Sequence, residues 1–301
     1  MSDFKRGIRD KTFLKALEKL AGQESWWRDV VMDSSLIIAV REEYLNVYWK
    51  GQSIFKVILE DGKVGASTHP KYLLNPDLSG QVPLIDDEFD LKKLETRMVT
   101  RAYEHGKTLA KLKRAAGLYS GREKEGVHAI ATSNPSVVDV EIALSANGLA
   151  DVGTLPRIDL AVFEPGDDEI NVVFWEAKTF SNPEAKSGAV VKQIEKYQKV
   201  IAAFRPQILD SYKCVASNLI AISDMSDGQR QVSDSIRQVA SNKARLVVSE
   251  ANVGLIVYGF DADQRDKKGK LLSDKLAADL AKLNIDSKRM KFKGDPKGLR
   301  I

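Results

Sequence analysis

The segment that most constrains the fold spans residues 157–178, RIDLAVFEPGDDEINVVFWEAK. Two apolar runs joined by an acidic turn predict a β-hairpin. Asp159, Glu176 and Lys178 lie inside the apolar runs rather than in the turn. Charged side chains in a buried strand are costly unless they are paired or bind a metal. The segment therefore predicts the centre of a sheet and, on that sheet, a chemical site.

The expected register of this hairpin brings the three ionisable residues together. If the turn centres on residues 167–168, Asp159 lies opposite Glu176, and cross-strand Cβ atoms are about 5 Å apart. Because side chains alternate along a strand, Glu176 and Lys178 share a face, and Asp159 can share it too. The other face is apolar and consists of Ile158, Leu160, Val162, Val173, Trp175 and Ala177.

Two neighbouring carboxylates repel each other, and a hard divalent cation relieves that repulsion. Mg²⁺ prefers oxygen ligands, usually one or two carboxylates with water and substrate phosphates. A lysine beside such a site can hold or help to deprotonate the attacking water, and the metal stabilises charge on a phosphoryl group. The alternative is a structural Asp/Glu–Lys cluster at the end of a sheet, because an isolated D…ExK match is common by chance.

Two motifs together resemble the PD-(D/E)xK nuclease superfamily, which has the restriction-endonuclease-like fold. The first is P-R-I-D, residues 156–159, followed after sixteen residues by E-A-K, residues 176–178. The Pro and Asp are not contiguous here, which is a frequent departure in that superfamily. The second motif, Q-I-E-K-Y, resembles the QxxxY motif of RecB-like members. Its Gln193 and Tyr197 lie four residues apart, on one helix face.

The resemblance implies roles for these residues in hydrolysing a phosphodiester bond by in-line attack. Mg²⁺, or Mn²⁺, would be held by Asp159, Glu176 and the backbone carbonyl of Ala177. Lys178 would orient and activate the attacking water. Two residues of the second motif would steady the lysine or a substrate phosphate, namely Gln193 and Tyr197.

The family also carries an acidic residue on a helix before the first core strand. Glu123 and Glu125 are both candidates, and we favour Glu123 because apolar residues follow it at the fourth and seventh positions. In that position Glu123 would complete the metal shell. Glu123 is also the third residue after Ser120, so it could simply close a capping box. Glu141 is a further candidate for the same role.

Strand and helix patterns alternate after residue 100, and this predicts an α/β domain over residues 101–301. Its mixed sheet, flanked by helices, would be of the restriction-endonuclease-like type. The expected strands are 137–145, 157–163, 170–178, 218–223 and 252–260. The expected helices are 120–132, 185–203, 230–243 and 273–283.

Residues 1–100 predict a smaller β-rich N-terminal unit for recognition or partner binding. A short helix at 13–20 precedes strands at 35–41, 45–51, 53–60 and 63–68, whose turns indicate an antiparallel meander. A loop at 75–87 and a long helix at 90–118 follow, the helix with an apolar stripe that includes Leu91, Leu94 and Met98. The N-terminal unit has a cluster of aromatic residues that could stack on bases, although we favour burial in the core. They are Trp26, Trp27, Tyr44, Tyr48 and Trp49.

Composition excludes several classes of protein. Hydrophobic residues make up 43% and charged residues 29%, which is ordinary for a globular chain. No apolar run is long enough for a membrane helix, and the N-terminus has no signal core. A single cysteine, Cys214, excludes a disulfide framework and a cysteine-based metal centre. No Walker A motif and no zinc spacing of histidines occur. We expect a protein of the reducing cytoplasm.

The charge distribution favours a nucleic-acid partner. The net charge is +4, but residues 264–301 hold twelve Lys or Arg against five Asp or Glu. A basic region on a near-neutral body suits a polyanion. We therefore expect a Mg²⁺-dependent deoxyribonuclease that serves restriction, repair or defence, with DNA favoured over RNA because most RecB-like relatives act on DNA. Two alternatives remain: a non-catalytic nucleic-acid-binding module, and a nuclease subunit that needs a partner protein. The sequence also leaves open whether the chain forms a homodimer.

Overall fold

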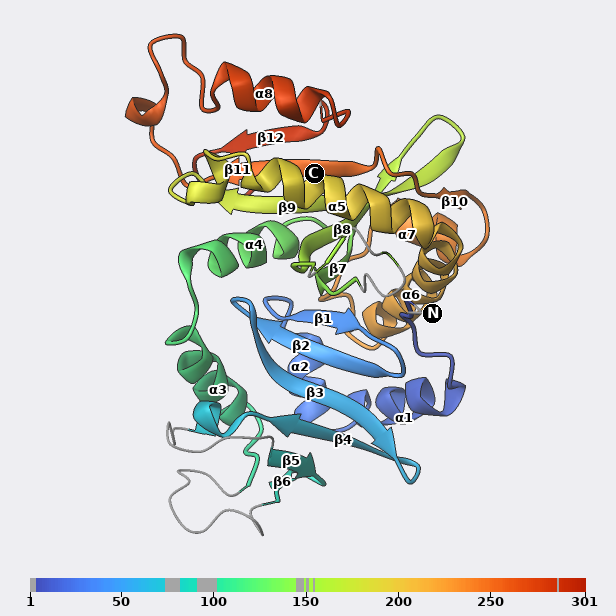
Figure 1. Ribbon diagram of the computed structural model, residues 1–301. Coiled ribbons are helices and arrows are strands. Elements are labelled where there is room, and N and C mark those ends of the chain that lie inside the picture. Colours follow the sequence, from blue (N-terminus) through green and yellow to red (C-terminus); the bar gives the residue numbers. More distant parts are fainter. Residues whose placement is uncertain are drawn as a thin grey trace. The chain divides into compact units, whose positions relative to one another are not determined.

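The computed structural model describes residues 4–73, 82–90, 102–144, 149, 152–153, 155–285 and 287–301 (Figure 1). The chain forms two compact units, each described separately below. The mixed-sheet unit consists of residues 4–5, 122–213 and 233–301. The antiparallel-sheet unit consists of residues 6–121 and 214–232. The division differs from the expected one at residue 100, because a helix beyond that position and a returning segment belong with the N-terminal sheet.

The mixed-sheet unit contains a six-stranded sheet whose main path is β12-β11-β9-β8-β7. Its strands are β7 (Val137–Ile142), β8 (Ile158–Pro165), β9 (Glu169–Thr179), β10 (Arg245–Val247), β11 (Val253–Tyr258) and β12 (Met290–Lys293). β7, β8 and β9 are antiparallel, whereas β10 and β11 run parallel to β9 and β12 runs parallel to β11. The predicted α/β class with a mixed sheet is confirmed.

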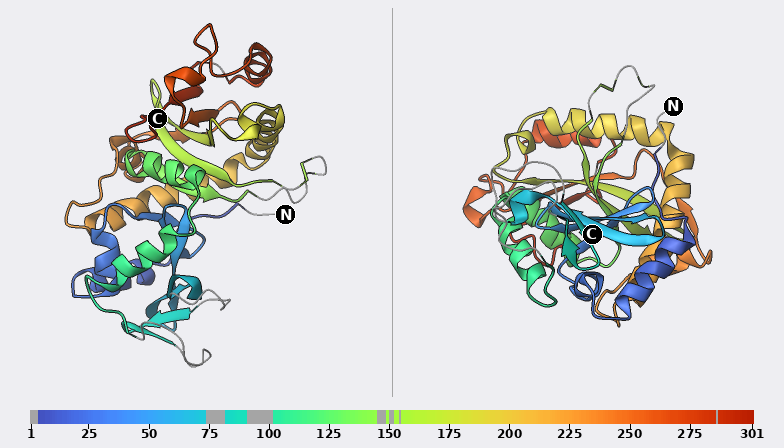
Figure 2. Two further views of the ribbon diagram at one scale, coloured as in Figure 1. Left: turned by 90° about the vertical axis from the view of Figure 1, so that its left-hand side faces the viewer. Right: turned by 90° about the horizontal axis from the view of Figure 1, so that it is seen from below.

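Helices cover both faces of this sheet. α4 (Arg122–Thr132) contacts β8 and β9, and α5 (Ala189–Ala203) contacts β11 and α8 (Asp274–Ala281). Figure 2 shows α4 and α5 on opposite faces, and α7 (Asp234–Ala240) also contacts β8. This double cover explains why β9 is buried at almost every position instead of at every second one.

Two glycines allow unusually close packing in this unit. A Cβ atom added at Gly254 of β11 would lie 2.4 Å from the ring of Trp175, and one added at Gly126 of α4 would lie 2.0 Å from the ring of Tyr258. The Tyr258 hydroxyl donates a hydrogen bond to the backbone carbonyl of Glu123 at 2.5 Å. These contacts fix the position of α4 against Tyr258 of β11, and Glu123 lies in the first turn of this helix.

The antiparallel-sheet unit contains a meander in which each strand pairs with the next. Its strands are β1 (Ile37–Val40), β2 (Tyr44–Trp49), β3 (Gln52–Glu60), β4 (Lys63–Thr68), β5 (Val82–Ile85) and β6 (Glu88–Phe89). The predicted meander is confirmed for the first four. The helical elements of this unit are α1 (Lys11–Ala21), α2 (Trp26–Met32), the 3₁₀ turn η1 (Pro70–Leu73) and α3 (Thr108–Gly117). α3 packs on β2, β3 and η1, which is why this unit extends to residue 121.

The aromatic residues of this unit are divided between core and surface. Trp26 and Trp27 are fully buried and Tyr48 is nearly so, which confirms the expected burial for these three. Tyr44 and Trp49 are only half-buried. Tyr44 and Trp49 are the first and last residues of β2, whereas the three buried aromatic residues lie in α2 or inside β2.

One predicted strand is wrong. Residues 218–223 lie in the twenty-residue helix α6 (Arg205–Asp224). An apolar run of this length does not distinguish a strand from a buried helix segment. The side chain of Asn218 on this helix accepts from the Ile8 N–H at 2.8 Å and donates to the Ile8 carbonyl at 3.0 Å. The helix is therefore tied to the N-terminal segment.

The boundaries of other elements also differ from expectation. The helix expected at 90–118 begins at Thr108, and residues 91–101, with Leu91, Leu94 and Met98, lie outside the described residues. The loop expected at 75–87 contains β5, and its residues 75–81 also lie outside them. The short strands β10 and β12 were not predicted, because each depends on a parallel neighbour far away in the sequence. Among the described residues, no helix is both long and apolar enough to cross a membrane.

Candidate active site

The β8–β9 hairpin has the predicted register. Leu160 lies opposite Trp175 and Pro165 opposite Ile170. One more step in this register, beyond the Leu160–Trp175 pair, places Asp159 opposite Glu176. The predicted juxtaposition of these two carboxylates on neighbouring strands is therefore present in the fold.

A backbone N–H of β9 holds the side chain of Asp159. Its Oδ2 accepts a hydrogen bond from the Ala177 N–H at 2.8 Å. Phe174 and Phe180 donate their N–H groups on the β11 side, so alternation directs the N–H and carbonyl of Ala177 toward β8. The Ala177 carbonyl thus lies on the Asp159 side of the strand. Burial and the neighbouring Glu176 carboxylate raise the pKa of Asp159 well above its usual value.

Glu176 is almost completely buried, at 2% exposure, and each of its oxygens has a donor. Oε1 accepts from Gln193 Nε2 at 2.8 Å and from Lys178 Nζ at 2.9 Å. Oε2 accepts from the Tyr197 hydroxyl at 3.0 Å. Burial raises the pKa of Glu176, and the Lys178 ammonium and the Tyr197 hydrogen bond offset part of that rise. The carboxylate is therefore fixed in one orientation.

Gln193 and Tyr197 lie side by side on α5, and both are buried. Gln193 Nε2 also donates to the Tyr197 oxygen at 2.6 Å, and this oxygen lies 3.2 Å from the Arg157 carbonyl. Burial raises the pKa of the Tyr197 hydroxyl, so it stays protonated. The resemblance implied that this pair steadies the lysine or a substrate phosphate. In the structure the pair instead binds the Glu176 carboxylate.

Lys178 is 6% exposed and lies between two carboxylates. Its Nζ is 2.9 Å from Glu176 Oε1 and 2.7 Å from Glu184 Oε2. Although burial opposes it, the negative charges of Glu176 and Glu184 raise the pKa of Lys178 above its usual value. Lys178 is therefore a cation at neutral pH.

Glu184 belongs to a short 3₁₀ turn, η2 (Pro183–Ala185), that sequence reasoning did not single out. Asn182 caps this turn, because its Oδ1 accepts from the Glu184 N–H at 2.9 Å. The signal was present in the sequence, since Asn followed by Pro and then an acidic residue is typical of a helical N-terminus.

Glu123 projects from α4 to the end of β9. Its Oε2 accepts from Asn182 Nδ2 at 2.7 Å and from the Thr179 N–H at 3.3 Å. Its negative charge contributes to the raised pKa values of Glu176 and Lys178. Of the two helix candidates, the favoured Glu123 thus lies beside the other site residues, whereas Glu125 is half-buried two positions further along α4.

Glu141 approaches Asp159 from the opposite side. Val140 pairs with Leu160 and Ile142 pairs with Ile158, so Glu141 on β7 lies opposite Asp159. Its backbone has a positive φ of 51°, and its charge contributes to the raised pKa of Asp159. The cations nearest to its carboxylate are Arg157 at 3.6 Å and Lys124 at 3.9 Å.

The residues fit a hard divalent cation by the chemistry of their donors. Asp159 and Glu176 supply two neighbouring carboxylates whose protonated forms are favoured by burial, and Ala177 supplies a carbonyl on the same side. Within the described part of the chain, no three His, Cys, Asp or Glu side chains form a group that could hold a metal ion by themselves. Mg²⁺ does not need three, because it usually binds one or two carboxylates and retains water.

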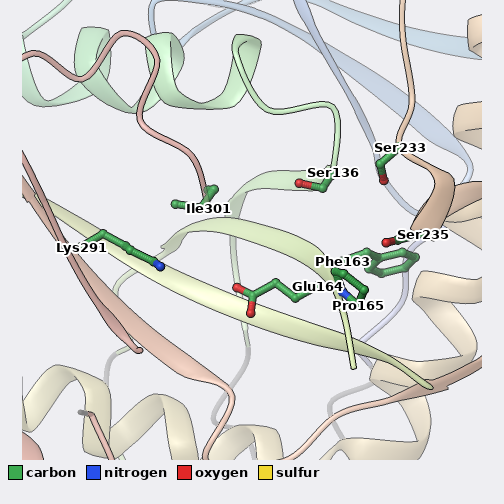
Figure 3. Close-up of a pocket in the computed structure, with 8 residues that line it drawn as sticks. All are labelled: Ser136, Phe163, Glu164, Pro165, Ser233, Ser235, Lys291 and Ile301. Carbon is green, nitrogen blue, oxygen red and sulfur yellow. The ribbon is translucent and has the colours of Figure 1, made fainter. Parts of the chain in front are cut away.

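A pocket of about 440 Å³ lies elsewhere on the mixed-sheet unit (Figure 3). Ser136, Glu164, Pro165 and Lys291 are among the residues that line it. Glu164 and Pro165 end β8, whereas Asp159 lies near its start, roughly 16 Å away along an extended strand. The pocket is therefore separate from the carboxylates.

Comparisons with protein-family models, with curated proteins and with solved structures found no match to this chain.

Proposed function

We propose that this chain is a metal-dependent nuclease of the PD-(D/E)xK type that hydrolyses phosphodiester bonds in DNA. The observation that carries the proposal is the pair of neighbouring carboxylates on β8 and β9, the half-buried Asp159 and the buried Glu176, next to a buried Lys178. Like charges placed together in a sheet core oppose folding, so their presence favours a chemical role over a structural one. The contact of Gln193 and Tyr197 with Glu176 connects the QxxxY-like motif to the same centre.

Each residue has a role in this proposal. Asp159, Glu176 and the Ala177 carbonyl would hold Mg²⁺, or Mn²⁺, with Glu123 or Glu141 near the shell. The bound ion would supply Lewis-acid stabilisation of charge on the phosphate and a lowered pKa of the attacking water. Lys178, a cation, donates a hydrogen bond that orients the water and stabilises negative charge on the phosphate.

The two residues of α5 act on this centre indirectly. Gln193 and Tyr197 hold the Glu176 carboxylate in one rotamer through hydrogen bonds of 2.8 and 3.0 Å. Hydrogen bonds of this kind, made to a residue that binds a metal, orient that residue and tune its basicity. In the proposed enzyme, the loss of these two hydrogen bonds would act mainly by weakening metal binding.

A non-catalytic module that binds nucleic acid is the second candidate. The observation that favours it is the closed network of the site, because Glu176 already has three donors and Lys178 has two carboxylates. Mg²⁺ would distinguish the two candidates. An enzyme should gain thermal stability on titration with Mg²⁺, and that gain should vanish in Asp159→Asn, whereas a binding module should show no gain.

The direct test is cleavage of circular single-stranded DNA and supercoiled double-stranded DNA with Mg²⁺, Mn²⁺ or EDTA. We expect metal-dependent cutting by the wild type and a loss of about 10²–10⁴-fold in Lys178→Ala. Lys192→Ala is the matched control, because Lys192 is an exposed lysine on α5 of the same unit. Cutting that is equal in Lys178→Ala and Lys192→Ala would contradict the proposed site.

Further substrates would define the biological setting. We propose DNA over RNA, and action in the cytoplasm in restriction, repair or defence. Labelled RNA and linear DNA in the same assay would separate a ribonuclease from a deoxyribonuclease, and an exonuclease from an endonuclease. Sedimentation of the active protein would show whether a homodimer or a partner protein is needed.

A further inference from the structure

One surface of the antiparallel-sheet unit gathers lysine ammonium groups on aromatic rings. We call Trp49, Lys71, Tyr72, Lys113 and Tyr119 the lysine–aromatic surface. These residues come from the end of β2, from η1, and from α3 and the segment that follows it. Figure 1 shows α3, η1 and the turn between β2 and β3 on the same side of this unit.

Gln52 at the start of β3 joins these segments. Its Nε2 donates to the Tyr119 carbonyl at 3.0 Å, and its Oε1 accepts from the Tyr72 hydroxyl at 3.1 Å and from Lys71 Nζ at 3.4 Å. Gln52 also pairs with Trp49 across the β2–β3 turn. The surface is therefore one connected network with a buried hub, in contrast to a scatter of solvated side chains.

The lysines lie over ring faces within this network. Lys71 Nζ is 4.9 Å from the centre of the Tyr72 ring and 4.8 Å from that of Tyr119. Lys113 Nζ is 4.2 Å from the Trp49 ring and pairs with Asp33 at 2.7 Å. Among the described residues, Lys71 has no carboxylate partner. Its ammonium is thus held in place over two rings, with no carboxylate among these residues to neutralise its charge.

Further cations lie on α3, the helix that ends just before the exposed Tyr119 ring. α3 carries Lys111, Lys113 and Arg114 and has no acidic residue. Lys111 and Arg114 are exposed, and no carboxylate of the described part of the chain forms an ion pair with either. Tyr119 is 42% exposed just beyond the end of this helix. An exposed aromatic ring beside unpaired cations is the combination with which proteins bind single-stranded nucleic acid.

We propose that the lysine–aromatic surface binds a single-stranded segment of nucleic acid. In this proposal the Tyr119 ring stacks on a base, while Lys71, Lys111 and Arg114 contact phosphates. An acidic peptide would satisfy the cations, but it would leave the exposed ring without a role. The inference rests on the proposed nuclease function for the nature of its ligand, and it assigns substrate binding to a unit that holds none of the catalytic residues.

The test is binding of a fluorescein-labelled oligothymidylate of roughly 20 nucleotides, long enough to fill one site, to the full chain in EDTA. Fluorescence anisotropy is followed over a series of salt concentrations. We expect Tyr119→Ala to weaken binding about tenfold at each salt concentration, while Tyr119→Phe, which keeps the ring, binds like the wild type. Lys71→Ala should reduce the slope of log K against log salt by about 0.7.

Lys63→Ala is the matched control, because Lys63 is an exposed lysine at the β3–β4 turn of the same unit. It should bind like the wild type, and thermal melts should show that every variant is folded. Equal binding by Lys71→Ala, Tyr119→Ala and the wild type would overturn the inference, as would no binding by the wild type. Competition by polyglutamate that depends on Lys71 but not on Tyr119 would assign an acidic protein partner instead and would also overturn it.

The cleavage assay separates this inference from the proposed function. If DNA is cut but these variants bind normally, the surface is not the binding site and the nuclease proposal stands. If no DNA or RNA is cut but Tyr119→Ala loses binding, the surface stands and the chain is a binding module.

Discussion

The two units bury charge in opposite ways. In the antiparallel-sheet unit, the Arg230 guanidinium donates to the backbone carbonyls of Val30, Val31, Asp33 and Leu36, at 2.6 to 2.8 Å. Burial lowers the pKa of Arg230 to about 10, so it remains a cation at neutral pH. In the mixed-sheet unit, Asp159 and Glu176 face each other, and both pKa values are raised by burial.

The difference separates a buried cation that the fold supplies with acceptors from a pair of carboxylates whose charged forms the fold disfavours. The fold supplies Arg230 with acceptors along a whole segment, so this cation stabilises the unit that contains it. The fold places the Glu176 carboxylate opposite Asp159, and Lys178 offsets only part of the resulting rise in the pKa of both groups. For this reason we propose the Asp159–Glu176 pair, and not Arg230, as the chemical site.

The largest stability effect should come from Arg230→Ala. Without the guanidinium, four carbonyl groups lose their donor, and we expect the free energy of unfolding to fall by about 3–5 kcal/mol. Urea unfolding followed by circular dichroism would measure this. Arg114→Ala, at an exposed arginine of the same unit, should change it by less than about 0.5 kcal/mol. Similar small losses in both variants would remove the structural half of the comparison.

Asp159→Asn should change the free energy of unfolding in the opposite direction. The substitution removes one of two desolvated like charges, so we expect the metal-free protein to gain about 1–3 kcal/mol of stability while it loses cleavage and the response to Mg²⁺. The amide oxygen can still accept from the Ala177 N–H. Asp168→Asn in the exposed turn is the control. A clear loss of stability in Asp159→Asn would mean that this carboxylate is structural, as Arg230 is.

Glu184→Gln should have the smallest effect. It removes the half-exposed partner of Lys178, while Glu176 still binds the ammonium. We expect kcat to fall about tenfold through looser positioning of Lys178, with KM nearly unchanged, and stability to change by less than about 1 kcal/mol. Glu195→Gln is the matched control, because Glu195 pairs with Lys199 on the outside of α5. Equal kcat values for the two variants would exclude a positioning role.

Local patterns in the sequence determined much of the fold and the candidate site. Alternation along 157–178 predicted the hairpin register that places Asp159 opposite Glu176. Helical spacing predicted that Gln193 and Tyr197 share a face, and they form a hydrogen bond to each other. These features depend on the period of a single strand or helix and on one tight turn, so they can be predicted without knowledge of the other elements.

Only the tertiary structure decided which elements meet. It placed Gln193 and Tyr197 on Glu176 instead of the lysine, brought Glu184 to Lys178, and set Glu141 against Asp159. It also made residues 218–223 part of a helix and joined residues 214–232 to the N-terminal sheet. The physical reason is that such contacts depend on packing between segments far apart in the chain, and a short apolar run is equally compatible with a strand or a buried helix until that packing is known.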